Sequence, residues 1–375
     1  MTKISYSRAG KSRVFASILV FAVTWTGAAC AQPATAPTVI STPIIVDGTL
    51  VSDASKPARD VSGIACARPR SGGQRTCLVV DDEAGFAQRV TLDGNTIRVG
   101  NSDVSLIQIL TRLDDPDIHG QRPTGLACRE DTDRFTQLDG EGVAFEETRA
   151  NGSGVFYVTG SHGCSRSSGQ GRPSQFILAR IIYDAETDTF GEAARTWRLS
   201  EALRAATTLG QRFGHLLDNA GGDGGLDIEG IAVDRGRLLV GFRAPNIGGN
   251  AFILPVPLAS LFVFGGAIVP EQLIELPLGR AEGIRDLASI PDGRLLVLTG
   301  PAPNEADVQA RLMAFDPLVG AASLAELAKL PAPTPNSAKY EGVVVLEQAG
   351  GALSVVIVQD GPPNGNPARL RISLP

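Results

Sequence analysis

The chain has 375 residues and is rich in glycine (43) and proline (24). Such a turn-rich composition, with many short apolar segments, favours an all-β architecture. The formal net charge is −6, and an acidic chain without a basic patch is a poor match to nucleic acid or to an anionic membrane.

Residues 1–31 have the pattern of a secretory signal. Four Lys and Arg residues precede an apolar segment from Val14 to Trp25, and Ala29-Cys30-Ala31 fits a small-x-small cleavage pattern before Gln32. Removing this leader would leave a net charge of about −10, since it carries four basic and no acidic residues. We therefore expect a periplasmic or secreted protein that keeps no transmembrane anchor.

Two alternatives remain for this leader. A membrane anchor is disfavoured because the apolar segment is too short to span a bilayer comfortably. A lipoprotein acylated at Cys30 is the second alternative, although Gly27 stands where such signals usually have leucine.

Four cysteines follow the leader, and an even number in an oxidising compartment predicts two disulfides. Cys66 and Cys77 lie in consecutive predicted strands, Ser62–Ala67 and Arg75–Val80. If these strands form a hairpin, the two cysteines lie opposite each other. We therefore predict Cys66–Cys77 and, by remainder, Cys128–Cys164. A zinc site is the alternative, but the spacings are wide and no CxxC motif occurs.

A Glu-Gly dipeptide recurs at the start of four short β-rich segments, and a fifth copy has serine in place of glutamate. The copies are Ser62-Gly63, Glu141-Gly142, Glu229-Gly230, Glu282-Gly283 and Glu341-Gly342. A second β-rich segment follows each copy, and a third often comes after it. Self-similarity of this kind predicts repeated units that stack against one another, and three or four antiparallel strands per unit are typical of a β-propeller.

We predict one propeller domain over residues 32–375, with five blades; a sixth, degenerate blade stays open. The third strands and candidate fourth strands include Gln175–Tyr183, Asn95–Val99, Arg195–Leu199 and Glu271–Leu276. The last unit lacks a fourth strand, and Thr38–Val46 could supply it and close the ring. One long gap between copies contains Ser200–Asn219, which we expect to be a short helical insertion capped by Ser200.

Propeller geometry predicts where the chemistry lies. Because blade strands alternate in direction, the start of each inner strand and the end of each second strand share one face. Glu141, Glu229, Glu282 and Glu341 would meet near the axis there, with Ser62 in the fifth place. The second-strand ends would add Asp82, His162, Arg243 and Asp360 to this face, and Arg285-Asp286 would join the same rim.

Carboxylates that converge on one opening repel one another, so a proton or a cation must compensate them. All-oxygen ligands favour Ca²⁺, with Mg²⁺ as a variant that keeps its waters. We expect Glu141, Glu229, Glu282 and Glu341 as the ligands of such a cation. The alternative is that these glutamates bond to neighbouring backbone N–H groups and connect the blades, and even a bound ion could be structural.

Single residues suggest roles in a reaction at this rim. His162 is one of three histidines and lies at a strand end, so we expect an acid–base role with Glu229, and Arg243 as an anion clamp. Substrate contacts are expected from Arg243, Arg285, Asp286, Asp82 and Asp360. An internal Arg285–Asp286 ion pair is the alternative for that dipeptide. No G-x-S-x-G elbow, H-E-x-x-H, Walker or Rossmann motif occurs.

The order of several short motifs is similar to that of a bacterial secreted family. The motifs are Gly160-Ser161-His162, Asp227–Ala232 (DIEGIA), Gly241–Pro245 (GFRAP), Glu282–Leu287 (EGIRDL), Thr299-Gly300-Pro301, Tyr340-Glu341-Gly342 and Gln359-Asp360-Gly361. They resemble, over roughly residues 60–374, the domain of unknown function numbered thirty-six sixteen. The resemblance implies a propeller fold related to phytase-like and esterase-like propellers but no reaction. Gln359 departs from the family pattern, which has aspartate there.

Two functional hypotheses follow. The first is an exported, monomeric propeller that binds a divalent cation and hydrolyses a small ester, lactone or phosphoester. The second is a non-catalytic binding or scaffold protein of the cell envelope, with a structural ion or none. Whether the protein is an enzyme, and which small molecule it binds, stays undecided at the level of the sequence.

Overall fold

The computed structural model describes residues 39–53, 56–69, 72–100, 105–131, 134–217, 224–302 and 308–374. The expected secretory signal, residues 1–31, and the alternative lipid acceptor Cys30 lie outside these ranges. Within them, no helix combines the length and the apolar character needed to cross a bilayer.

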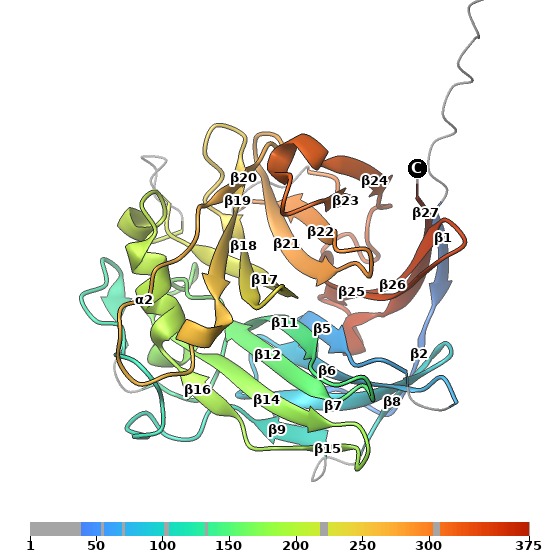
Figure 1. Ribbon diagram of the computed structural model, residues 1–375, viewed down its shortest axis with the longest axis horizontal. Coiled ribbons are helices and arrows are strands. Elements are labelled where there is room, and N and C mark those ends of the chain that lie inside the picture. Colours follow the sequence, from blue (N-terminus) through green and yellow to red (C-terminus); the bar gives the residue numbers. More distant parts are fainter. Residues whose placement is uncertain are drawn as a thin grey trace, which may run out of the picture. The chain divides into compact units, whose positions relative to one another are not determined.

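Residues 39–374 form a five-blade β-propeller (Figure 1). In each blade the chain starts at the axis and runs outward through antiparallel neighbours. From the axis outward, blade one has β5 (Val61–Cys66), β6 (Arg75–Asp81), β7 (Phe86–Asp93) and β8 (Thr96–Val99), and blade two has β11 (Gly140–Glu147), β12 (Gly154–Gly160), β14 (Leu178–Asp184) and β15 (Thr189–Phe190), with β16 (Ala194–Thr196) also on β14. Blade three has β17 (Asp227–Asp234), β18 (Arg237–Ala244), β19 (Ala251–Pro257) and β20 (Ile274–Leu276), and blade four has β21 (Glu282–Ser289), β22 (Leu295–Pro301), β23 (Arg311–Phe315) and β24 (Ala325–Lys329). Blade five has β25 (Lys339–Ala349), β26 (Ala352–Asp360), β27 (Ala368–Ser373) and β1 (Val39–Pro43).

The five inner strands contact one another in the cyclic order β5, β11, β17, β21, β25 and back to β5. Glycines permit this close approach at the axis. A Cβ added to Gly63 would lie 2.7 Å from the backbone oxygen of Glu141, and one added to Gly230 would lie 2.5 Å from the Cα of Asp286. The glycine of the repeated dipeptide therefore serves packing between neighbouring blades.

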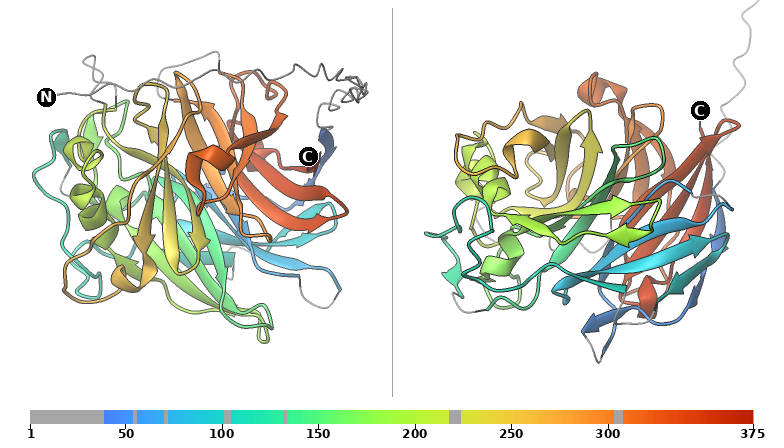
Figure 2. Two further views of the ribbon diagram at one scale, coloured as in Figure 1. Left: turned by 45° about the horizontal axis from the view of Figure 1, so that its top comes forward. Right: turned by 60° about the horizontal axis from the view of Figure 1, so that its bottom comes forward.

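The N-terminal strand closes the ring. Strand β1 pairs antiparallel with β27, with Val39 opposite Ile372, and so completes the last blade as predicted for segment 38–46. The chain then continues into β2 (Ile45–Asp47), which pairs parallel with β8 of blade one. One segment thus joins the outer edges of the last and first blades (Figure 2).

Apolar side chains fill the spaces between neighbouring sheets. Blades four and five share a buried cluster that includes Leu298, Leu312, Val355 and Ile357. Both faces of a central blade strand are covered, so strand β26 is buried over almost its whole length rather than in alternation. Burial of each such side chain stabilises the fold by about 1.5–3 kcal/mol, which explains the short continuous Val, Ile and Leu runs in the sequence.

The two long insertions do not form a sixth blade within the described residues. The first contains β9 (Leu106–Gln108), which pairs with β7, and β10 (Arg129–Glu130), which pairs parallel with β13 (Gln170–Gly171). Elsewhere in the chain, short 3₁₀ turns are η1 (Pro173–Phe176), η3 (Leu258–Ser260), η4 (Gly320–Ser323) and η5 (Pro363–Gly365), and a small ribbon joins β3 (Val51–Asp53) to β4 (Lys56–Pro57).

The helical insertion exists but differs from the prediction at both ends. Helix α2 spans Arg198–Ala205, and the 3₁₀ turn η2 (Gly210–Arg212) follows it. Ser200 lies inside the helix and is not its cap. The hydroxyl of Thr196 accepts a hydrogen bond from the backbone N–H of Arg198 (3.0 Å), which turns the chain from β16 into the helix. The predicted strand 195–199 therefore ends at Thr196. Residues 218–219 of the expected insertion lie outside the described ranges.

Both predicted disulfides are present. Cys66 and Cys77 are directly paired residues of β5 and β6, and Cys128 bonds Cys164. The zinc alternative is wrong, because all four sulfur atoms are used in disulfides. Two disulfides fit an oxidising compartment such as the periplasm or the cell exterior.

Candidate functional site

Each inner strand begins with a β-bulge that leaves one residue out of register. Near the start of every inner strand its register with the second strand skips one residue of the inner strand, and these residues are Ser62, Glu141, Glu229, Arg285 and Glu341. A bulge inserts an extra residue opposite its partner and changes the direction of its side chain. The five skipped residues are thus structurally equivalent and mark one end of the axis.

The fourth blade departs from the repeat expected from the sequence. Its bulge falls at Arg285, three residues after Glu282. Glu282 instead accepts hydrogen bonds from the Thr299 hydroxyl (2.5 Å) and the Arg311 Nε (2.9 Å) within its own blade. The structure therefore does not bring Glu282 to the other three glutamates, and an arginine takes the equivalent position.

The remaining three glutamates do converge. Glu141, Glu229 and Glu341 each offer a carboxylate oxygen, and these atoms lie within 4.8 Å of one another. Glu229 and Glu341 are 2% and 4% exposed. Among the described residues, no hydrogen bond or close ion pair reaches the Glu141 carboxylate, on which Arg243 and Arg285 act only at longer range.

Two arginines compensate the other acids. Arg285 pairs with Glu341, and its Nη2 lies 3.5 Å from Glu229 Oε2. Arg243 lies 2.7 Å from Glu229 and 2.6 Å from Asp227. Arg243 also occupies a skipped position, between the pairs Asp227↔Ala244 and Ile228↔Phe242. Both arginines predicted from the sequence are thus at the rim, and both face carboxylates.

Burial and like charges raise the proton affinity of these acids. Desolvation, followed by the charges of Glu229 and Asp139, raises the pKa of Glu141 well above its ordinary value. Desolvation also raises the pKa of Asp227 to about 7, although the guanidinium of Arg243 opposes this shift. The trio therefore favours either a proton or a cation at Glu141.

A cavity of about 630 Å³ opens over this trio. A second ring of residues lines it, two positions before the bulged residue of a blade: Asp60, Asp139, Asp227 and Lys339. Lys339 was missed by the sequence reasoning, although its offset from Glu341 equals that of Asp139 from Glu141. Arg166 was also missed, because nothing distinguishes it within a polar loop.

Asp82 and Asp360, both predicted from the sequence, lie in this cavity. Asp60, Asp81 and Asp82 also converge, with ligand oxygens within 4.8 Å of one another. Desolvation and the charge of Asp139 raise the pKa of Asp82 to about 9. Asp360 lies 2.8 Å from Lys339 Nζ. The cavity thus holds Asp82, which is protonated at neutral pH, and Asp360, which is paired with Lys339.

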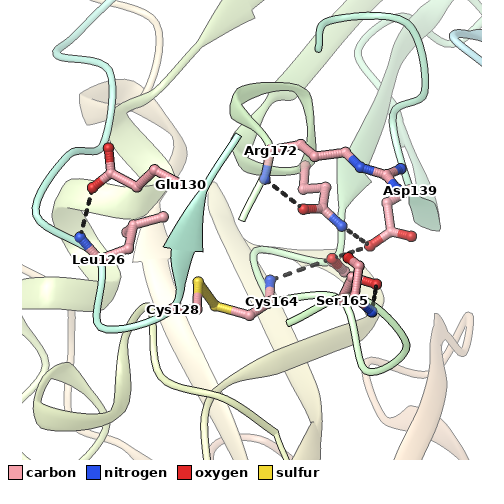
Figure 3. Close-up of a disulfide and its surroundings, with 11 residues drawn as sticks. Leu126, Cys128, Glu130, Asp139, Cys164, Ser165 and Arg172 are labelled. Carbon is pink, nitrogen blue, oxygen red and sulfur yellow. Dashed lines mark hydrogen bonds between the residues drawn. A yellow bond between two sulfur atoms is a disulfide. The ribbon is translucent and has the colours of Figure 1, made fainter. Parts of the chain in front are cut away.

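The Cys128–Cys164 disulfide anchors one wall of the cavity, since Cys164 lines it (Figure 3). Asp139, in the left-handed conformation (φ 55°), accepts hydrogen bonds from the Ser161 hydroxyl and from Gln175 Nε2 (2.8 Å). Gln175 in turn accepts from the backbone N–H of Arg172 (2.8 Å). The disulfide and this chain of hydrogen bonds hold the Ser161–Ser167 loop against the second ring.

His162 is not brought to the cavity. It is 0% exposed, its Nδ1 lies 3.1 Å from the Gly160 oxygen, and its ring meets Phe176 edge-on. Burial lowers the pKa of its imidazole to about 4, so the ring is neutral at pH 7. The structure therefore gives His162 no contact with the converging carboxylates.

Asp286 also lies away from the cavity. It is fully buried, and its two carboxyl oxygens accept hydrogen bonds from the backbone N–H groups of Leu287 (2.7 Å) and Val343 (2.6 Å). The second of these bonds crosses from blade four to blade five. Asp286 thus connects two blades through backbone N–H groups, which is the role that the sequence offered as an alternative for the glutamates.

Comparisons with known proteins give one family match. A family model described as "Protein of unknown function (DUF3616)" matches residues 184–371. A comparison with curated proteins finds no match.

Solved structures with similar folds share little sequence with this chain. Zg3597, a family 117 glycoside hydrolase of the marine bacterium Zobellia galactanivorans, is 8% identical with a TM-score of 0.42 over 90% of this chain and 91% of that chain. An α-L-arabinanase of Cellvibrio cellulosa is 11% identical with a TM-score of 0.41 over 84% and 91%. The tail fiber of Staphylococcus aureus phage P68 is 9% identical with a TM-score of 0.38 over 89% of this chain, which spans about half (52%) of that fiber. These low identities carry no information on activity.

Proposed function

The chain belongs to the family of proteins of unknown function DUF3616, and because that description names no reaction, we propose a function from the site itself. We propose an exported propeller that binds a divalent cation through Glu141, Glu229 and Glu341 and hydrolyses a small ester, lactone or phosphoester. One observation carries the proposal: three carboxylates converge in a cavity, and Glu141 has neither a hydrogen bond nor an ion pair.

The donor set fits a hard cation. Three carboxylate oxygens within 4.8 Å of one another suit Ca²⁺, or Mg²⁺ with retained waters, and offer no nitrogen or sulfur ligand that would favour zinc. Glu282, expected as the fourth ligand, is replaced by Arg285, so water or substrate oxygens would complete the shell. When bound, the cation would supply Lewis-acid chemistry and lower the pKa of a water.

The chain's own residues support hydrolysis in other ways. Arg243 and Arg285 hold Glu229 and Glu341 in position through ion pairs. Asp82, protonated at neutral pH, can give its proton to the leaving oxygen. In the overall step water adds its oxygen to the acyl or phosphoryl centre and releases one proton to solvent, the bond to the leaving oxygen breaks as that oxygen takes the proton of Asp82, and Asp82 is reprotonated from solvent.

The first test measures whether the protein binds the cation, without any substrate. EDTA-treated protein should gain thermal stability when Ca²⁺ is added, by roughly 2.7 kcal/mol at a free concentration about 100-fold above Kd. Glu141→Gln should remove most of this gain, while Glu192→Gln, at an exposed glutamate outside the cavity, should keep it. An unchanged melting curve in the wild type would contradict the cation site.

The second test measures hydrolysis of generic substrates. We expect the Ca²⁺-loaded protein to hydrolyse generic p-nitrophenyl esters or p-nitrophenyl phosphate, and Glu141→Gln to lose this activity. Full activity in Glu141→Gln would show that the trio is not the reaction centre.

A non-catalytic binding protein is the second candidate. It is favoured by the two arginines, which already neutralise Glu229 and Glu341 without any ion. In that case Ca²⁺ would leave both the melting curve and every substrate unchanged.

A further inference from the structure

A second cavity, of about 800 Å³, adjoins the acidic one. The two share Arg166, Arg243 and Lys339 in their common wall. The second cavity extends along the end of β22 and along the segment that joins blades four and five, with Pro301, Leu330 and Pro333 in its lining. Its size is that of a site for a small organic ligand.

The two cavities have opposite character. Nine Asp and Glu residues line the first cavity. Among the described residues that line the second there is no Asp or Glu, and its four charged residues are all cationic. The rest of its lining is mostly alanine, proline, valine and leucine. The second cavity is therefore apolar along its length and cationic at the end where the two cavities meet.

The cationic end has donors without acceptors. The Nε groups of Arg243 and Arg285 are buried and make no hydrogen bond within the described residues. The two residues are only 6% and 2% exposed. Arg166, exposed at the shared wall, makes no hydrogen bond or ion pair in the described part of the chain. The two buried Nε groups are closed off from the cavity, whereas Arg166 is accessible at the junction and can donate to a ligand oxygen there.

We propose that the second cavity binds the apolar acyl part of a carboxylic ester, with its carbonyl oxygen at the Arg243–Arg285 end. This proposal rests on the proposed function and narrows its substrate class. The scissile bond then lies at the junction, and the leaving group extends into the acidic cavity. A phosphomonoester fits less well, because a dianion would lie among nine carboxylates and could not use the apolar wall.

The acid released from such an ester should bind the second cavity without any reaction. Each methylene removed from water favours binding by about fourfold, the factor that corresponds to the transfer of one CH₂. Hexanoate should therefore bind at least about tenfold more tightly than acetate even if only part of its chain is buried.

We would measure binding of hexanoate, acetate and inorganic phosphate by ligand-observed NMR, in EDTA so that no cation contributes. Two variants fill the cavity from exposed lining positions, Ala332→Trp and Ser337→Trp. Ala322→Trp is the matched control at an exposed alanine outside both cavities.

We expect hexanoate to bind more tightly than acetate, phosphate to show no binding, and each filling variant to weaken hexanoate by tenfold or more. Ala322→Trp should bind hexanoate like the wild type. Equal affinities for hexanoate and acetate, tighter binding of phosphate, or unchanged binding in both filling variants would overturn the proposal. Binding of hexanoate without ester turnover would contradict the proposed hydrolysis while leaving the acyl cavity intact.

Discussion

Blade four differs from the other four blades at the axis. In the others the bulged residue is serine or glutamate and glycine follows it, whereas in blade four the bulge carries Arg285 and Asp286 follows. The Glu-Gly dipeptide of blade four, Glu282-Gly283, lies three residues earlier and pairs with strand β22 in normal register. In blade four the repeated Glu-Gly dipeptide is thus shifted by three residues relative to the repeated β-bulge.

The difference changes the electrostatics of the whole rim. With a fourth glutamate in place of Arg285, four carboxylates at the axis would share the one guanidinium of Arg243. Arg285 supplies one, since it lies against both Glu229 and Glu341. Only Glu141 is left without a partner, which concentrates the excess negative charge at one residue.

Arg285→Met should have the largest effect. The change leaves Glu229 and Glu341 facing each other without this guanidinium, in a region where all three side chains are at most 5% exposed. Removing one partner of a buried ion pair costs about 3–5 kcal/mol. Denaturant unfolding of the wild type and the variant measures the difference.

Arg280→Met is the control for that change, because Arg280 is exposed and should alter stability by less than about 0.5 kcal/mol. A loss below about 1 kcal/mol in Arg285→Met would mean that the acids at the rim are protonated or solvated enough to need no guanidinium.

The two glutamates that look equivalent in the sequence should respond differently to the same substitution. Glu282→Gln weakens charged hydrogen bonds from Thr299 and Arg311 and should cost about 1.5–3 kcal/mol. Glu141→Gln, measured in EDTA, removes repulsion and should leave the free energy of unfolding unchanged or raise it. Equal losses in the two variants would contradict the separation of Glu282 from the trio.

The pH dependence of stability tests the acids of the cavity without any substitution. Desolvation raises the pKa of Asp82 to about 9 and of Asp81 to about 6 in the folded state, above the value of about 3.9 in an unfolded chain. The folded protein therefore binds more protons than the unfolded chain. The stabilisation is complete below about pH 4 and is lost as the pH rises from there through these folded values, so the Tm should fall as the pH rises from about 4 to about 9.

Asp82→Asn should flatten the upper part of this decline, between about pH 7 and 9. Asp114→Asn, at an exposed aspartate, is the matched control and should follow the wild-type curve. A wild-type Tm that rises over this range would show that the cavity acids are ionised and compensated.

Local patterns were enough to predict the propeller, the first three strands of each of its five blades and both disulfides. Short β-branched segments, turn residues and the recurring Glu-Gly dipeptide predict the strands and turns within one blade. Cys66 and Cys77 lie in neighbouring strands, so their pairing could be predicted as well. The closing strand could also be predicted, because the last unit lacked a fourth strand and an unassigned apolar segment followed the leader.

The composition of the site was decided by the tertiary structure. The position of a β-bulge depends on how the backbone of one inner strand packs against the next, and one shift of register brings Arg285 to the axis and leaves Glu282 with Arg311. The burial of His162 and the connection from Asp286 to Val343 likewise depend on neighbouring loops and blades. The sequence by itself determined the repeated unit, whereas contacts between units, made by residues far apart in the chain, determined which side chains share the cavity.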